Sequence, residues 1–270
     1  MKSRVISGVL LAVGIIAILV YTPPWALGVV VSIALVIAAS EYQAMSPFEA
    51  RGLDRAVFTA ACAFNLAWPV LVPIFPALTF LMTLTFGFCL LCLNRLFNPK
   101  PIEDVMHRLG IDALGYLYLS CTFPFVFMLR LEEHGGWILM FAMLITFTAD
   151  TGAYFAGRFF GRRPLYQLVS PKKTMEGAIG GMTVATASAF VAQLYFPGLT
   201  NLSTLDCIFL GVGGSVFAVL GDLVESLMKR SFGVKDSGQL IPGHGGILDR
   251  VDGLLFCGPF VAVYLGLFVR

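Results

Sequence analysis

The stretch DCIFLGVGGSVFAVLGDLVESLMKR, Asp206 to Arg230, decides the fold that we predict. It is apolar over most of its length and reaches the roughly 20 residues that a helix needs to cross a bilayer. Its last third carries four polar side chains at i, i+3, i+4 and i+7, on one helical face: Asp222, Glu225, Ser226 and Lys229. Charge at membrane depth costs roughly 2.5–3.5 kcal/mol on insertion scales, so this face indicates a functional site. A simple ion pair between Glu225 and Lys229 is the alternative for those two residues.

The rest of the chain has the same apolar character. Its 270 residues are 58% hydrophobic and 13% charged, with a mean hydropathy of +0.85, whereas soluble domains are about 45–50% apolar and about 25% charged. We therefore predict an all-α polytopic integral membrane protein. Apolar runs indicate nine candidate transmembrane helices, at roughly 5–20, 26–40, 56–72, 77–93, 111–129, 137–156, 177–195, 207–228 and 253–269.

Basic residues predict the orientation of these helices. With the N-terminus in the cytoplasm, nine spans place all but Arg130 and Arg270 of the 18 Lys and Arg on the cytoplasmic side, as expected for cytoplasmic loops. We expect the C-terminus outside, a location in the cell inner (cytoplasmic) membrane and an active site that faces the cytoplasm. A signal peptide at Val5–Val20 is the alternative, but YTPPW offers no small-residue cleavage pattern.

Two parts of the chain differ in their loops. Residues 1–135 should form an apolar transmembrane scaffold of about five helices, and residues 136–270 a catalytic bundle of about four. From Gly135 onward the predicted cytoplasmic loops lengthen and fill with basic residues and glycine. All six cysteines lie inside predicted spans, so no disulfide framework is expected. The pair Cys89-x-x-Cys92 lacks the further ligands of a zinc site.

The stretch IPGHGGILDRVDG, Ile241–Gly253, offers partners for Asp222. Asp249 and Asp252 are three residues apart, so on a helical turn both carboxylates would share a face. Magnesium is usually bound by one or two carboxylates together with substrate phosphates. Three converging carboxylates therefore predict a metal site. The alternative is that Asp249 pairs with Arg250 or caps the helix.

Three glycines surround His244 in the same stretch: Gly243, Gly245 and Gly246. Glycine lets the backbone approach a ligand closely and turn its N–H groups toward an anion. We expect the glycines to contact phosphate, and a tight interhelical turn is the alternative. His244 could orient phosphate, transfer a proton or hydrogen-bond the loop.

A second loop, SPKKTMEGAIGG from Ser170, points to anion binding as well. Ser170 and Pro171 are typical of an N-cap and a first helical residue. Lys172 and Lys173 would then lie in the first turn, where the helix dipole favours anions. Two adjacent lysines there predict an anion held between them and the helix N-terminus. Contact with anionic lipid headgroups is the alternative.

Asp150, in TFTADTGAYFAGR, lies near the end of another apolar span. It could bind substrate, which we favour, or bond to Thr148 and Thr151. Carboxylates for a divalent metal, glycine loops and basic residues on one membrane face predict a heavily phosphorylated substrate. Their position in membrane helices predicts a lipid as the second substrate.

The stretch SLMKRSFGVKDSGQLIPGHGGILDRVD, Ser226–Asp252, closely resembles the signature of the phosphatidate cytidylyltransferases, or CDP-diacylglycerol synthases. It matches in turn Ser, an apolar step, Lys-Arg, Lys-Asp, His-Gly-Gly and Asp-Arg-x-Asp, a highly specific pattern. DTGAYFAGRFFGRR and SPKKTMEG also look like segments of this family, so the resemblance covers roughly residues 140–270. Met175 stands where many members have Trp.

The resemblance implies that CTP and phosphatidic acid react to give CDP-diacylglycerol and pyrophosphate, with Mg²⁺ as the divalent cation. A two-metal centre is one form that this site could take. The residues expected to be catalytic are Asp222, Asp249 and Asp252, also expected as metal ligands, together with Lys172 and Lys173. The residues expected to bind substrate are Ser170, Glu176, Glu225, Lys229, Arg230, Lys235, Asp236, Gly243, His244, Gly245, Gly246, Arg250 and Asp150.

A phosphate monoester is largely ionised near pH 7, its second pKa being about 6, so no strong general base is needed and His244 keeps an orienting role. Membrane lipids are expected partners, nucleic acid is not, and a homodimer stays open. Two other functions remain. A CTP-dependent polyprenol kinase would need a base such as His244 or Asp236. An ion-coupled transporter would use intramembrane acids, commonly at the midplane between repeats.

Overall fold

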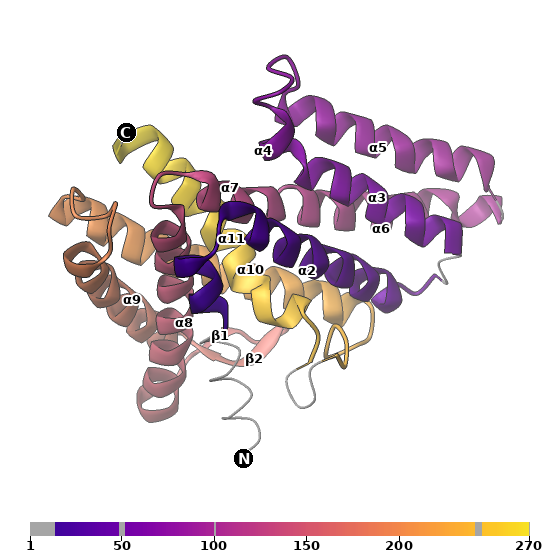
Figure 1. Ribbon diagram of the computed structural model, residues 1–270. Coiled ribbons are helices and arrows are strands. Elements are labelled where there is room, and N and C mark those ends of the chain that lie inside the picture. Colours follow the sequence, from indigo (N-terminus) through magenta and orange to yellow (C-terminus); the bar gives the residue numbers. More distant parts are fainter. Residues whose placement is uncertain (1–13, 49–51, 100, 241–244, 270) are drawn as a thin grey trace.

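The computed structural model describes residues 14–48, 52–99, 101–240 and 245–269 (Figure 1). Their fold is almost entirely helical, with one short hairpin of strands β1 (Pro164–Tyr166) and β2 (Ser170–Thr174). The helices are α2 (Pro24–Met45), α3 (Gly52–Leu66), α4 (Trp68–Leu71), α5 (Phe80–Phe97), α6 (Val105–Ser120), α7 (Phe123–Leu131), α8 (Gly135–Phe160), α9 (Met175–Tyr195), α10 (Thr204–Ser231) and α11 (Leu248–Tyr264). A 3₁₀ turn at Ile102–Asp104 precedes α6, and a π-helical turn at Leu265–Val269 follows α11.

In the described part of the chain, seven helical segments are long and apolar enough to cross a membrane. They are Pro24–Met45, Phe80–Phe97, Ile102–Leu131, Gly135–Phe160, Met175–Tyr195, Thr204–Ser231 and Leu248–Val269. The predicted multi-pass all-α membrane protein is thus confirmed. Of the other two predicted spans, α3 has only 15 residues, and the span at 5–20 lies largely outside the described residues. The count of nine therefore stays a prediction.

The span predicted at 111–129 is two helices, α6 and α7. Helix α6 ends at Ser120, and Pro124 lies in the first turn of α7. Proline has no N–H and is tolerated in a first turn, but in the interior of a continuous helix it would remove a hydrogen bond.

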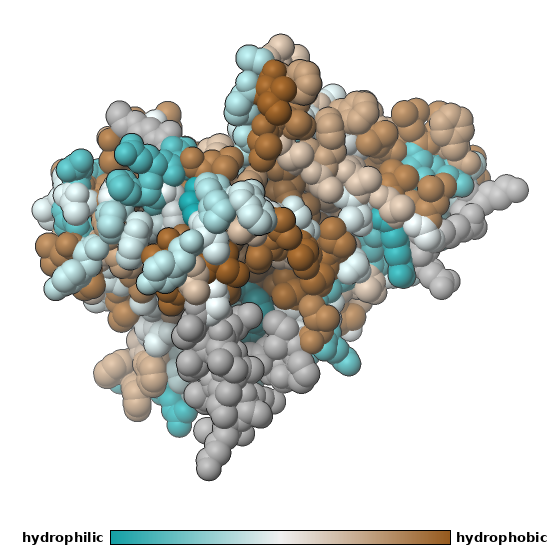
Figure 2. Space-filling model, viewed as in Figure 1, coloured by the Kyte–Doolittle hydropathy of each residue, from teal (hydrophilic) through white to brown (hydrophobic). Residues whose placement is uncertain are grey.

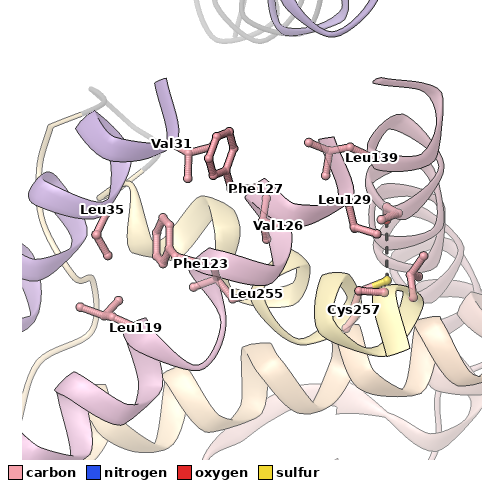
Figure 3. Close-up of a cluster of buried hydrophobic side chains, with 14 of the residues drawn as sticks. Val31, Leu35, Leu119, Phe123, Val126, Phe127, Leu129, Leu139, Leu255 and Cys257 are labelled. Atoms are coloured by element: carbon pink, nitrogen blue, oxygen red, sulfur yellow. Dashed lines mark hydrogen bonds between the residues drawn. The ribbon is translucent and has the colours of Figure 1, made fainter. Parts of the chain in front are cut away.

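Helices α2 and α7 lie between two groups of helices, with α3, α5 and α6 on one side and α8 to α11 on the other (Figure 1). Their buried side chains form one core with those of α11. In Figure 3, Leu35 of α2, Phe123 of α7 and Leu255 of α11 belong to the same apolar cluster, each at most 3% exposed. The first half of the chain therefore packs directly against the helices that carry the predicted site.

Apolar side chains also cover much of the surface. Figure 2 shows brown side chains over the upper right of the molecule, where Figure 1 places α4 and α5. On α5, Leu81 is 68% exposed and Phe97 is 77% exposed. Contiguous apolar surface of this extent marks contact with a membrane or a partner, and lipid would cover it in a bilayer.

A buried ion cluster joins α3, α5 and α6. The Arg95 guanidinium lies 3.2 Å from an Asp54 carboxylate oxygen and 2.6 Å from one of Asp112. Because a buried charge must be paired to be tolerated, this pairing explains how α3, α5 and α6 carry these charges in the interior.

Helices α8 and α9 approach closely through small residues. A Cβ atom added at Gly181 would lie 2.6 Å from the backbone oxygen of Ala149, and one added at Gly152 would lie 2.9 Å from the Val184 Cβ. Small residues let membrane helices pack backbone to backbone. This packing places the end of α8 beside the hairpin and the start of α9.

Gly181→Ala is expected to lower the melting temperature in detergent, because the new methyl group must push α9 away from α8. Alanine favours a helix over glycine by about 1 kcal/mol, but overpacking costs about 1–3 kcal/mol. Gly110→Ala in α6 is the matched control, since nothing lies within 4 Å of its added Cβ. It should keep or raise the melting temperature, and the same response at both positions would contradict this packing.

The hairpin corrects one prediction. Ser170 does not cap a helix that begins at Pro171; both belong to strand β2, and Lys172 and Lys173 lie in that strand as well. The N-cap is Thr174, whose hydroxyl accepts a hydrogen bond from the Gly177 N–H at 3.1 Å. Ser-Pro is compatible with an edge strand as well as with a helix start. The helix therefore begins at Met175, four residues after the predicted start at Pro171.

Candidate active site

Lys173 of β2 meets Asp222 of α10. The Lys173 Nζ lies 2.5 Å from an Asp222 carboxylate oxygen, and the Ser226 hydroxyl donates to the other oxygen at 3.2 Å. The Asp222 side chain is 31% exposed and that of Lys173 25% exposed. This partly exposed pair joins the β1–β2 hairpin to the polar face of a membrane helix.

One turn further along α10, Glu225 and Lys229 form the i,i+4 pair considered as an alternative from the sequence. The Lys229 Nζ donates to Glu225 at 2.6 Å and to Asp249 of α11 at 2.5 Å. Glu225 is completely buried and Lys229 is 8% exposed. Lys229 thus links α10 to α11, because its Nζ binds one carboxylate on each helix.

Asp249 organises the connection between α10 and α11. Besides Lys229 at Oδ1, its Oδ2 accepts from the backbone N–H groups of Ser237 and Gly246 at 2.9 and 2.8 Å, and from the Ser237 hydroxyl at 2.8 Å. The Asp249 carboxylate makes these bonds with Lys229 and the loop, and not with Arg250, its alternative partner from the sequence. Asp249 holds the loop in place rather than standing free for a ligand.

The glycines have a local role in this loop. Gly245 has φ +83°, a left-handed conformation that glycine adopts readily, and an added Cβ would lie 2.5 Å from the Asp249 carboxylate. A Cβ at Gly246 would lie 2.5 Å from both carboxylate oxygens of Glu41. Because these two glycines have no side chain, the carboxylates of Asp249 and Glu41 can approach the backbone of the loop closely. Gly243 and His244 lie outside the described residues.

Glu41 of α2 is a site residue that the sequence did not reveal. It is 7% exposed, and its two oxygens accept from the backbone N–H groups of Ile247 and Leu248, both at 2.9 Å. Ser237 donates to it at 3.2 Å. The first N–H groups of α11 are thus satisfied by a carboxylate 206 residues away in sequence. An acid in an apolar helix was the available signal.

Glu41→Gln is expected to loosen this loop. A glutamine amide has one acceptor oxygen, and its NH₂ would face a backbone N–H, so the variant should lose roughly 2 kcal/mol of stability. Brief trypsin treatment should cleave faster after the exposed Lys235 in the variant than in the original protein. Glu103→Gln, in an exposed 3₁₀ turn, is the control. Equal cleavage of all three proteins would contradict the anchoring role.

Asp252 and Asp150 complete an acidic cluster around Asp222. Asp252 interacts electrostatically with Asp222 and Asp150, and Asp150 interacts with Asp222, Lys173 and Arg250. Thr148 and Thr151 bond to backbone oxygens within α8, at 2.6 and 2.7 Å. Three helices and the hairpin thus bring acids and bases from distant segments together.

Other predicted residues lie outside this cluster. The Glu176 carboxylate accepts from the N–H groups of Arg162 and Arg163 at 3.0 and 3.2 Å and so fixes the start of the hairpin. Ser170 pairs with Tyr166 across the hairpin. Four more residues are exposed, on strand β2, at the end of α10 or on the segment that follows it: Lys172, Arg230, Lys235 and Asp236. They can meet a ligand or lipid headgroups from the surface.

A divalent cation would need carboxylates from this cluster. Magnesium uses one or two protein carboxylates and completes its shell with water and phosphate oxygens. Asp222 and Asp252 are the two carboxylates that would serve, since like-charge repulsion between them would be relieved by a cation. Among the described residues, no three His, Cys, Asp or Glu side chains are close enough to hold a metal by themselves. Substrate phosphates would have to complete the coordination.

Comparison with known proteins agrees with this chemistry. The model of the cytidylyltransferase family matches residues 2–268. The chain belongs to this family. Among its relatives, the phosphatidate cytidylyltransferase of Bacillus subtilis is 42% identical over 166 residues, which is 60% of each chain. That of Haemophilus influenzae is 44% identical over 157 residues, 54% of each chain. That of Staphylococcus saprophyticus is 39% identical over 179 residues, 66% of this cytidylyltransferase and 64% of the relative.

Each match covers less than two thirds of the relative's own length. Family membership therefore rests on the family model, which extends over almost the whole chain. The reaction and the substrates have to be argued from the site of this cytidylyltransferase.

Proposed function

We propose that this cytidylyltransferase makes CDP-diacylglycerol and pyrophosphate from CTP and phosphatidic acid, as a step of phospholipid biosynthesis. The observation that carries the proposal is the pairing of Lys173 with Asp222 at 2.5 Å, within electrostatic range of Asp252. A basic residue and carboxylates at the end of a membrane helix suit the joining of a nucleotide to a lipid phosphate. The names of the relatives support the same substrates.

In this reaction an oxygen of the lipid phosphate attacks the α-phosphorus of CTP. The new P–O bond forms as the bond to the oxygen bridging the α- and β-phosphorus breaks, and pyrophosphate leaves with that electron pair. Positioning and charge neutralisation dominate such transfers. The lipid phosphate is already largely ionised near pH 7, since its second pKa is about 6, so the chain need not remove a proton from it.

The residues of the cluster would have different roles in this reaction. Lys173 and Arg250 would neutralise phosphate charge, and Asp222 with Asp252 would hold Mg²⁺. When bound, magnesium would neutralise charge on the phosphate oxygens. Lys229, with Glu225, Asp249 and the loop, would keep α10 and α11 in register rather than contact the triphosphate, because its Nζ is engaged by two carboxylates.

We also propose nine membrane spans, a cytoplasmic N-terminus and an active site that faces the cytoplasm in the inner membrane. The near-complete segregation of Lys and Arg supports this orientation. In Figure 1 the hairpin and the α10–α11 connection both lie toward the lower side of the molecule. A homodimer stays a prediction.

Release of pyrophosphate tests this proposal. Purified protein in detergent should release pyrophosphate from CTP only when phosphatidic acid and Mg²⁺ are both present. EDTA should stop the release, and added Mg²⁺ should restore it, because the carboxylates alone cannot neutralise the triphosphate. A polyprenol kinase would instead release CDP and would need a polyprenol, so that product pattern would replace the proposed function.

A further inference from the structure

Tyr118 of α6 has a buried hydroxyl with no hydrogen-bond partner in the structure. The residue is 7% exposed. Buried hydroxyl groups almost always have a partner, and leaving one without a partner costs about 1–3 kcal/mol. A buried hydroxyl without a partner therefore raises the question of which group it binds in the working protein.

This tyrosine lies within electrostatic range of the acids of the candidate site. Tyr118 interacts electrostatically with Glu225, Asp252 and Asp222. Its ring lies 6.1 Å, centroid to centroid, from that of Phe256, which follows Asp252 by one turn of α11. The tyrosine thus reaches from the scaffold half of the chain to the contact between α10 and α11.

A matching acceptor lies in the same cluster. Glu225 is completely buried, and while its Oε2 accepts from Lys229, its Oε1 is buried without a partner. Glu225 also interacts electrostatically with Asp252. A donor and an acceptor that both lack partners therefore lie within electrostatic range of each other and of a carboxylate expected to hold the metal. A hydrogen bond between them, direct or through a water, would satisfy both groups.

We propose that Tyr118 is a positioning residue of the active site, whose hydroxyl donates a hydrogen bond to the Glu225 carboxylate in the substrate complex. This inference rests on the proposed function and extends it to the scaffold half. The bond fixes Glu225, and through its charge the orientation of Asp252, while α10 and α11 hold the nucleotide. Outer groups that orient metal ligands typically change activity or metal affinity by about 10–100-fold.

Tyr118→Phe removes only the hydroxyl and keeps the ring against Phe256. We expect kcat to fall by about 10–100-fold, with the KM for CTP within about twofold and the melting temperature unchanged or higher. Stability should not fall, because the variant removes a buried hydroxyl that lacks a partner in the free protein. Tyr116→Phe, two residues earlier, is the matched control: its hydroxyl donates to the Leu84 carbonyl at 2.9 Å, away from the acids. It should lower the melting temperature and leave kcat unchanged.

Three results would overturn the inference: a kcat for Tyr118→Phe within twofold of the original, a change confined to KM, or a kcat loss accompanied by a lower melting temperature. If the original protein does not transfer the cytidylyl group at all, both the proposed function and this inference are wrong. If the original protein is active and Tyr118→Phe has the same kcat, only this inference is wrong.

Discussion

Asp222→Asn is expected to abolish cytidylyl transfer while the protein stays folded in detergent. Asparagine keeps the shape of the side chain and its bond with Ser226 but removes the negative charge that faces Lys173 and the proposed metal. Loss of one preorganised electrostatic group costs about 10²–10³ in kcat in other enzymes, and we expect at least about 10³ here, or about 4 kcal/mol. The side chain is 31% exposed, so the melting temperature should change little.

Asp206→Asn, at the other end of α10, is the matched control for this variant. Asp206 forms a capping box with Ser203 and accepts from the Tyr264 hydroxyl at 2.8 Å, far along the helix from the cluster. Its variant should lower stability by about 1 kcal/mol and leave kcat unchanged. If Asp222→Asn kept more than a tenth of the original kcat, the assignment of Asp222 to the metal would be wrong.

Lys229→Met should cause the largest loss of stability. The variant leaves the carboxylates of Glu225 and Asp249 without their shared cation, and Glu225 is completely buried. Removing one partner of a buried ion pair typically costs about 3–5 kcal/mol. The midpoint of thermal unfolding in detergent should fall by roughly 10 °C.

Two further variants separate the ion network from simple loss of a lysine. Glu225→Gln combined with Lys229→Met removes one uncompensated charge, so it should be more stable than Lys229→Met alone. Lys235→Met, at an exposed position, should melt within about 2 °C of the original, as surface substitutions do. A double variant no more stable than the single one would show that the buried charge is not the cause.

Features that depend on local pattern could be predicted from the sequence. Hydrophobic runs gave the membrane helices, because length and apolarity are properties of a single segment. The four-residue spacing of Glu225 and Lys229 gave their ion pair, which the structure confirms at 2.6 Å. The polar face of α10 also led directly to Asp222.

Features that depend on contacts between residues far apart in the sequence could not be predicted from it. Lys229 reaches Asp249 on the next helix, and Glu41 caps α11 from α2, because tertiary packing and not spacing brings them together. The hairpin at Lys172 and Lys173 was missed since Ser-Pro is compatible with both a strand and a helix start. The break between α6 and α7, at Cys121 and Thr122, was missed because the apolar run continues through it.

The position of the label transferred from CTP tests the central claim most directly. Purified protein would be incubated with phosphatidic acid, Mg²⁺ and CTP labelled at either the α- or the γ-phosphorus, and the extracted lipid would be counted. We predict α-label in the lipid, no γ-label, and neither with Asp222→Asn. Transfer of γ-label to a lipid, or no α-label from well-folded protein, would contradict cytidylyl transfer by this site.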